Sequence, residues 1–108
     1  MEKAKLQAEY GLYINGQWRP AANGDTYTAE SPADGSHLAV CAQATRGDVD
    51  DAVKAAWEAF KTWKKTTPAQ RAALLNKIAD IIDANKEHLA MVESMDNGKP
   101  IRETMNVD

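Results

Sequence analysis

The hydrophobic pattern of this chain changes at Thr45, where short alternating segments separated by turns give way to stretches with helical spacing. Three turn dipeptides precede this point, at the roughly ten-residue spacing that is typical of consecutive short strands: Asn15-Gly16, Asn23-Gly24 and Asp34-Gly35. Apolar residues then recur at i, i+3, i+4 and i+7, which is the template of an amphipathic helix. The sequence therefore predicts a mixed α/β fold in which a small sheet precedes a helical region.

The strand region is expected over residues 11–44, as a short antiparallel β-meander that follows an N-terminal tail at residues 1–10. Asn15-Gly16 is well suited to a two-residue hairpin loop, because both central residues of such a turn need positive φ. Pro32 ends the third strand because proline cannot donate to a β-ladder. The predicted strands are 12–14, 17–19, 25–30 and 37–43.

The helical region is expected over residues 45–108 and begins with two N-cap signals. Thr45 with Asp48 resembles a capping box, and Thr67 with Pro68 and Gln70 is a stronger one. Asn85 is expected to break the second helix, and a third helix is expected over residues 86–95. We therefore predict three helices and the first turns of a fourth.

The join between the third and fourth helices lies at Met95 to Thr104. Gly98 supplies the left-handed residue that closes a helix, and Pro100 is tolerated in the first turn of the next one. The fourth helix has only eight residues, through Asp108, so we expect this chain to be the front of something longer. Asp96 lies at the negative end of its helix, where an acid is disfavoured. Its expected partner is a local backbone N–H, Lys99 or a bound cation.

Composition excludes several classes of protein. The hydrophobic share of 44% and charged share of 27% are those of a globular domain, not a disordered one. A net charge of -3 with dispersed basic residues argues against a nucleic-acid surface. No apolar run has the length of a membrane span, and the N-terminus lacks the apolar core of a signal peptide. A single cysteine fits a reducing compartment, so we expect a cytoplasmic protein.

Side chains that carry catalysis or bind metals are scarce. Cys41 lies in an alternating strand pattern without a basic neighbour, so we interpret it as structural. His37 and His88 are far apart, and neither has a second metal ligand at i+3 or i+4. No glycine-rich phosphate-binding motif occurs. The acids at 48, 50 and 51 crowd a helix N-terminus, where capping electrostatics explains them. Trp57 and Trp63 lie near the apolar side of a helix, which favours core packing or an interface.

Several segments of this chain occur in a distinctive order and spacing: Leu12 to Trp18, Glu30 to Gly35, Asp48 to Ala56, Trp63, Arg71 to Asp80 and Met95 to Pro100. In that order and spacing they resemble the N-terminal region of the aldehyde dehydrogenase superfamily. The ending Pro100 to Thr104 looks most like bacterial enzymes that act on acetaldehyde and similar short aldehydes. The resemblance implies that the predicted strands and helices flank a dinucleotide-binding domain.

The family resemblance also implies an activity. Members oxidise aldehydes to carboxylic acids with NAD or NADP, and the resemblance implies a homo-oligomer with a small aldehyde as substrate. Their nucleophilic cysteine lies in a Gly-Gln-x-Cys context, which Cys41 does not match. The general-base glutamate, the oxyanion asparagine and the cofactor-binding loop are also expected downstream. No catalytic or cofactor-binding residue is therefore assigned in this chain, and the isolated polypeptide is expected to be inactive.

One site does carry over from the family. Many members hold a monovalent cation through backbone carbonyls before an Asn-Pro or Ser-Pro turn and through the Asp of an Asp-Asn-Gly-Lys-Pro motif. The corresponding residues here are Ala29, Glu30 and Asp96. The resemblance thus implies a Na+ or K+ site, with the further ligands supplied by the rest of the enzyme.

A different class of function remains open. The segment is also compatible with a free-standing helical protein-interaction module, in which apolar helix faces form a docking surface. The residues of that surface would be Phe60, Trp63, Ile78 and Ile82.

Overall fold

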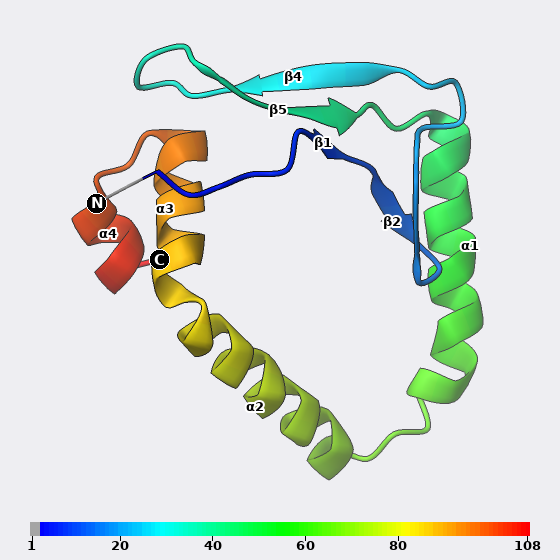
Figure 1. Cartoon of the computed structure of the whole chain (residues 1–108). Helices are drawn as coiled ribbons and strands as arrows, with labels where there is room; N and C mark the ends of the chain where they lie inside the picture. The colour runs from blue at the N-terminus through cyan, green and yellow to red at the C-terminus, as the bar shows by residue number, and fades with distance from the viewer. Residues whose placement is uncertain (1–2) are drawn as a thin grey trace. The chain divides into compact units, whose positions relative to one another are not determined.

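The computed structural model describes residues 3–108, which contain five short strands and four helices (Figure 1). The strands are β1 (Glu9–Tyr10), β2 (Leu12–Ile14), β3 (Gln17–Arg19), β4 (Thr26–Glu30) and β5 (His37–Ala42). The helices are α1 (Arg46–Trp63), α2 (Pro68–Ala84), α3 (Lys86–Asn97) and α4 (Ile101–Asn106). The predicted α/β order, with strands before helices, is confirmed.

The strands form two small sheets. β2 and β3 make an antiparallel hairpin in which Leu12 pairs with Arg19 and Ile14 with Gln17. In the other sheet, β5 lies between β1 and β4. β1 pairs with β5 in parallel, so this region contains one parallel pair beside its antiparallel hairpin. β1 lies inside the segment that was predicted to be an N-terminal tail. No sequence pattern predicted this strand, because two residues are too few to show an alternating pattern.

The chain divides into two compact units, each described here separately. The first, the hairpin unit, comprises residues 7–28 and 39–66 and includes α1. Within it, the β2–β3 hairpin lies beside α1 (Figure 1). The hairpin tip faces small side chains of this helix, namely Ala52, Ala55, Ala56 and Ala59. The larger apolar side chains of α1 are exposed.

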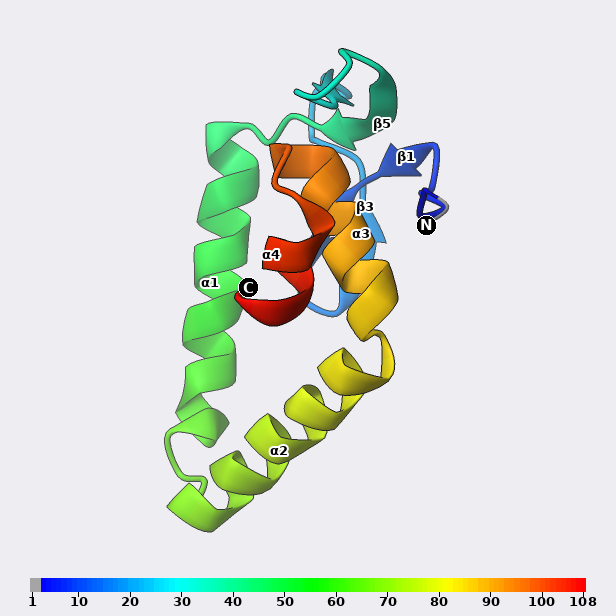
Figure 2. The same cartoon turned by 90° about the vertical axis from the view of Figure 1, so that its left-hand side faces the viewer.

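The second unit, the helical unit, comprises residues 29–38 and 67–108 together with the segment that ends at Leu6. Its α3 and α4 lie side by side (Figure 2). Two hydroxyls join these helices, because Ser94 Oγ lies 2.8 Å from Oγ1 of the buried Thr104. Ala90 is buried on α3, and its small side chain permits close packing at that point.

The helix ends follow the predicted local chemistry. Thr45 and Thr67 both form complete capping boxes, with Asp48 and Gln70 as their partners. Gly98 closes α3 in the left-handed conformation at φ 81°. Pro100 precedes the first residue of α4 and takes the N-cap position, one residue earlier than in the predicted helix.

The apolar core is small. The buried hydrophobic residues within 3–108 are Ala21, Ala39 and Ala90. In β5 the buried side chain is Ala39, while its neighbours Leu38 and Val40 are half-buried. The described residues include no helix that is both long and apolar enough to cross a membrane.

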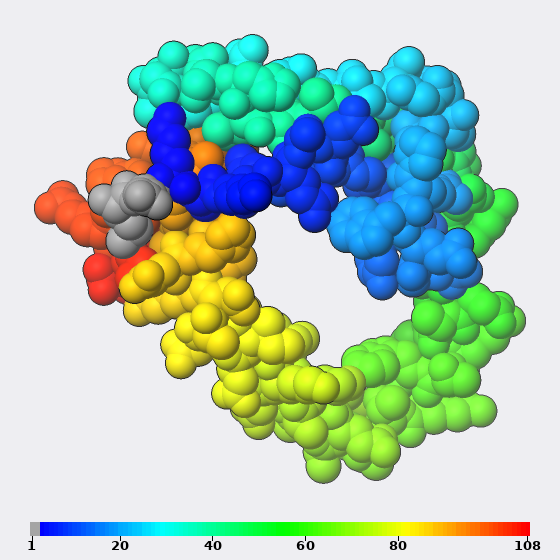
Figure 3. All heavy atoms as spheres, in the orientation of Figure 1, coloured from blue at the N-terminus to red at the C-terminus, as the bar shows by residue number. Residues whose placement is uncertain are grey.

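Large apolar side chains along α1 and α2 are exposed. In the space-filling view, α2 belongs to the yellow-green to yellow stretch (Figure 3). Ile78, in the middle of α2, is 52% exposed. The exposed residues on α1 are Val49, Val53, Trp57, Phe60 and Trp63, and those on α2 are Leu74, Leu75, Ile78, Ile81 and Ile82.

Candidate functional site

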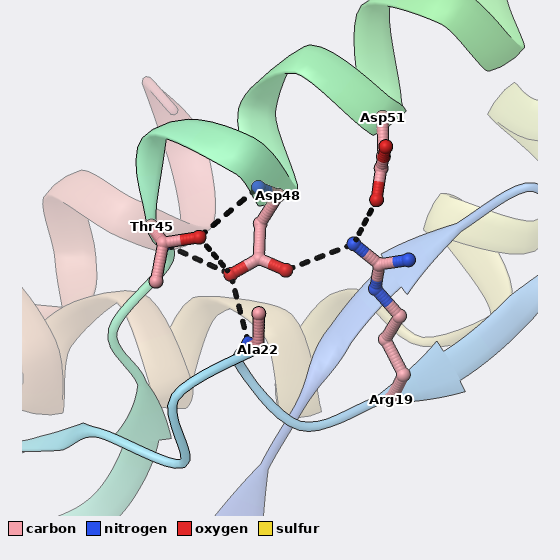
Figure 4. Close-up of polar contacts among 5 residues, drawn as sticks. All are labelled: Arg19, Ala22, Thr45, Asp48 and Asp51. Carbon is pink, nitrogen blue, oxygen red and sulfur yellow. Dashed lines mark hydrogen bonds and ion pairs between the residues drawn. The ribbon is translucent and has the colours of Figure 1, made fainter.

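The buried polar centre of the hairpin unit is Asp48, which is only 1% exposed (Figure 4). Its Oδ2 accepts hydrogen bonds from the backbone N–H and the hydroxyl of Thr45, each at 2.9 Å. The same oxygen accepts the backbone N–H of Ala22 at 3.1 Å. Its Oδ1 accepts from Nη2 of Arg19 at 2.9 Å, and that guanidinium also reaches Asp51 at 3.1 Å.

These contacts stabilise the ionised form of Asp48. Hydrogen bonds from the backbone N–H groups of Thr45 and Ala22 outweigh burial and lower the pKa of the Asp48 carboxyl to about 2. On the other side of the pair, the hydrogen bond to Asp51 and the one to Asp48 raise the pKa of Arg19. An acid that stays ionised, with its oxygens occupied, is poorly suited to proton transfer. The cluster is therefore structural.

From the sequence, the acids at 48, 50 and 51 were assigned to the dipole at a helix N-terminus, but the first turn of α1 contains only Asp48 among them, and for Asp48 that interpretation is incomplete. The carboxylate also binds Ala22 and Arg19, which lie 26 and 29 residues away in the sequence. The local signal was the capping-box spacing from Thr45. No sequence pattern pointed to Arg19, whose Nε is buried and has no hydrogen-bond partner among residues 3–108.

The helical unit contains the residues of the predicted cation site. Ala29 is half-buried and Glu30 exposed at the end of β4, and Asp96 is exposed in the last turn of α3. A β-carbon on Gly98 would lie 3.1 Å from Cγ of Pro32. The segment after β4 therefore lies against the α3–α4 turn, which brings the neighbourhood of Glu30 to that of Asp96.

Two of the three partners expected for Asp96 have other contacts. Lys99 Nζ lies 2.7 Å from Asp108, and this hydrogen bond raises the pKa of Lys99. The backbone N–H of Lys99 donates to Oδ1 of Asn97 at 2.8 Å. The expectation that Lys99 or this turn N–H satisfies Asp96 is therefore wrong, because the Lys99 side chain pairs with Asp108 and its backbone N–H donates to Asn97.

The remaining candidates for catalysis or metal binding lie apart. Cys41 is a free, half-buried cysteine in β5, as the alternating pattern predicted. His37 begins the same strand and His88 lies on α3, and both are exposed. Within residues 3–108, no group of three or more His, Cys, Asp or Glu side chains is placed to hold a metal ion. A cation at Asp96 would therefore depend on carbonyl ligands.

Trp57 and Phe60 form an exposed aromatic pair on α1. Their ring centroids are 6.0 Å apart at 85°, an edge-to-face contact. Lys64 Nζ lies 5.9 Å from the centroid of the Phe60 ring. These side chains form neither a buried core nor a polar site, so they belong with the other uncovered apolar residues of α1.

Comparison with known proteins gives consistent matches along this chain. The model of the aldehyde dehydrogenase family matches residues 18–108. A protein of Bacillus subtilis that carries the name aldehyde dehydrogenase DhaS is 45% identical over 105 residues. The match covers 95% of this chain and 21% of that protein. The EPTC-inducible aldehyde dehydrogenase of Rhodococcus erythropolis is 41% identical over 103 residues, 95% of this chain and 20% of its own.

Solved structures agree with these sequence matches. The aldehyde dehydrogenase KauB of Pseudomonas aeruginosa superposes with a TM-score of 0.89 at 37% identity, covering 95% of this chain and 21% of KauB. An indole-3-acetaldehyde dehydrogenase in complex with NAD+ gives the same score, identity and coverage. This chain thus spans about a fifth of the length of the curated relatives it matches.

Proposed function

Because the chain belongs to the aldehyde dehydrogenase family, we propose that it is the N-terminal part of an enzyme that oxidises a short-chain aldehyde to the carboxylic acid with NAD or NADP. The family match over residues 18–108 is the observation that carries this proposal. Solved relatives in complex with NAD+ support the choice of cofactor. We further propose that the complete enzyme is a cytoplasmic homo-oligomer.

The chemistry is proposed to reside outside these 108 residues. Cys41 is the single cysteine and does not occur in a Gly-Gln-x-Cys segment. Residues 3–108 also lack a glycine-rich loop at the start of a helix, so nothing here fits the pyrophosphate of a dinucleotide. A downstream cysteine thiolate is expected to attack the aldehyde, and the bound nicotinamide supplies the hydride acceptor.

The role proposed for this segment is structural. The apolar faces of α1 and α2 are exposed along their length, whereas a stable soluble domain normally covers such faces. Relatives are about five times longer and contain this segment in a closely similar conformation. We therefore propose that the remainder of the enzyme covers these faces and that the segment flanks the dinucleotide-binding domain.

A monovalent cation site at Asp96 forms part of this proposal. The Asp96 carboxylate has no hydrogen bond or ion pair within residues 3–108, and hard oxygen donors suit Na+ or K+. Backbone carbonyls at Ala29 and Glu30 are the proposed co-ligands. The test is the melting temperature of the complete enzyme in K+ and in a large organic cation, with Asp96→Asn beside the control Asp80→Asn. Equal K+ dependence in all three proteins contradicts the site.

The main test is to express the complete reading frame and to measure NAD or NADP reduction with acetaldehyde. We expect the reading frame to continue beyond Asp108 and to encode a Gly-Gln-x-Cys segment. Turnover is expected to require the cysteine of that segment. The purified 108-residue chain should give no turnover. A stop codon directly after Asp108, or activity of the short chain, contradicts the proposal.

The alternative function is a free-standing interaction module. The exposed apolar faces of α1 and α2 favour it because they offer a docking surface for a partner. It predicts that the short chain unfolds in one cooperative transition on denaturant titration. The enzyme proposal predicts a shallow transition, because each unit lacks much of its covering surface. Circular dichroism during a urea titration separates the two.

A further inference from the structure

The chain contains three Asn-Gly pairs, which differ in their hydrogen bonding. An Asn-Gly pair is chemically labile because glycine has no side chain to shield its backbone nitrogen. Two of the pairs are tied by hydrogen bonds and one is not. The pairs are Asn15-Gly16, Asn23-Gly24 and Asn97-Gly98.

We propose that Asn15 is a site of spontaneous deamidation in the folded chain and that the fold protects Asn23 and Asn97. In the reaction, the backbone nitrogen of the following glycine attacks the side-chain amide carbon of asparagine. A new C–N bond forms, the amide C–N bond breaks and ammonia leaves. Water then opens the succinimide ring to give aspartate or isoaspartate, so the net change is amide plus water to acid plus ammonia.

Both reacting groups are tied at Asn23-Gly24. The Asn23 side chain donates to Oδ2 of Asp25 at 3.0 Å and accepts the Asp25 backbone N–H at 3.0 Å. The attacking nitrogen of Gly24 donates to the carbonyl of Ala21 at 2.9 Å. Ring closure at this pair requires all three bonds to break.

The same is true at Asn97-Gly98. The Asn97 side chain donates to Glu93 at 2.6 Å and accepts the backbone N–H of Lys99 at 2.8 Å. The Gly98 nitrogen donates to the carbonyl of Ser94 at 3.0 Å, within the closing turn of α3. This pair is therefore held by the helix end itself.

Asn15-Gly16 has none of these ties among residues 3–108. Neither the Asn15 side chain nor the Gly16 backbone nitrogen forms a hydrogen bond there. Both residues are exposed, and no atom outside residues 15–17 lies within 4 Å of the position that a Gly16 β-carbon would take. Water therefore has free access to the pair.

The hairpin that carries the pair is small enough to open locally. β2 and β3 have three residues each and form a two-stranded sheet, an element that is marginal on its own. Asn15 is held at φ 52°, a conformation that is uncommon for a residue with a side chain. Brief opening of the tip lets the Asn15 backbone reach the geometry that ring closure needs.

Isoaspartate at this position would alter the turn. It adds one atom to the backbone of a two-residue loop whose twist matches the flanking strands. The ladder pairs of this hairpin, from Ile14–Gln17 to Leu12–Arg19, depend on that turn. Modification at the tip is therefore expected to loosen the hairpin that presents Arg19 to Asp48.

The experiment is a time course of the purified complete enzyme in mildly alkaline buffer, with and without guanidinium chloride, analysed by peptide mass spectrometry. Trypsin spares the Arg19-Pro20 bond, so Asn15 and Asn23 share one peptide and fragment ions must locate the modified residue. Asn97 lies in a separate peptide, Glu87 to Arg102. Isoaspartate is measured independently by methylation with a protein isoaspartyl methyltransferase.

In the folded chain, Asn15 is expected to react roughly ten-fold or more faster than Asn23 and Asn97, since each protected pair must lose several hydrogen bonds. In guanidinium the three rates should converge, because the reacting dipeptide is the same. Equal rates in buffer, a faster reaction at Asn23 or Asn97, or a preference for Asn15 that persists in guanidinium each overturns the proposal.

Discussion

Nη2 of Arg19 in β3 lies 2.9 Å from Oδ1 of Asp48 in the first turn of α1, and this ion pair joins the hairpin to the helix that it lies against. The same carboxylate completes the capping box of Thr45. One buried acid thus closes a helix end locally and fixes a distant strand. Because both tasks depend on one side chain, changes at this position should affect the whole hairpin unit.

Asp48→Ala is expected to destabilise the hairpin unit much more than Asp50→Ala, although both acids lie near the N-terminus of α1. The first change leaves the N–H groups of Thr45 and Ala22 and part of Arg19 without an acceptor. Asp50 is exposed and serves as the matched control. Far-UV circular dichroism and the urea midpoint of the complete enzyme measure the difference, and equal midpoints for the two variants would refute it.

Thr45→Ala isolates the capping contribution. It removes the hydroxyl that accepts the Asp48 backbone N–H at 3.1 Å but leaves the Arg19 pair in place. Loss of an N-cap of this kind costs about 1 kcal/mol of unfolding free energy. The expected order of stability is therefore wild type, then Thr45→Ala, then Asp48→Ala, as read from urea titration.

Acid is expected to destabilise the chain between about pH 4 and pH 2. The folded-state pKa of Asp48 is about 2, below the ordinary value of 3.8. Its contribution to stability is therefore fully present above pH 3.8 and is lost as the pH falls through about 2. Asp34 has a similar pKa of about 2, lowered by its hydrogen bonds from Ser36. In a plot of stability against pH, Asp48→Asn should reduce the loss of stability between about pH 4 and pH 2. If that loss is unchanged even in the double variant Asp48→Asn/Asp34→Asn, these two acids do not cause it.

Gly11→Ala is expected to destabilise the hairpin unit by about 1–3 kcal/mol, the usual cost of overpacking. A β-carbon at Gly11 would lie 2.8 Å from the backbone carbonyl oxygen of Arg19, which cannot move without breaking the β2–β3 pairing. Gly47→Ala is the control, since its β-carbon would meet only Thr45 Oγ1 at 3.7 Å. In a helix that change should be neutral or stabilising by roughly 0.5–1 kcal/mol. Chemical denaturation of the pair measures both effects.

The exposed face of α2 should bind a hydrophobic dye. Ile78→Gln removes apolar surface from the centre of that face, whereas Lys77→Gln changes a neighbouring polar position. Dye fluorescence is expected to fall for the first variant and to stay unchanged for the second, with the helical signal of both preserved. Equal fluorescence in the two variants would show that the dye binds elsewhere.

Local chemistry made much of the fold predictable. Thr45 and Thr67 mark helix starts, Asn85 separates two helices, and Gly98 closes a third, each at the predicted residue. The Asn15-Gly16 hairpin likewise has its predicted strands. In every case the signal and the structure lie within a few residues of each other, because a cap or a turn is satisfied by its own neighbours.

The sequence alone determined where this chain turns, caps and changes from strand to helix, since those choices depend on backbone groups and side chains within one turn of each other. Only the tertiary structure decided that β1 pairs in parallel with β5, that Lys99 meets Asp108 and that Arg19 reaches Asp48. Two of those contacts join residues that are distant in the sequence, and the third joins residues on either side of α4. These contacts contribute to stability only when the backbone has already brought the groups together, so no local pattern of residues predicts them.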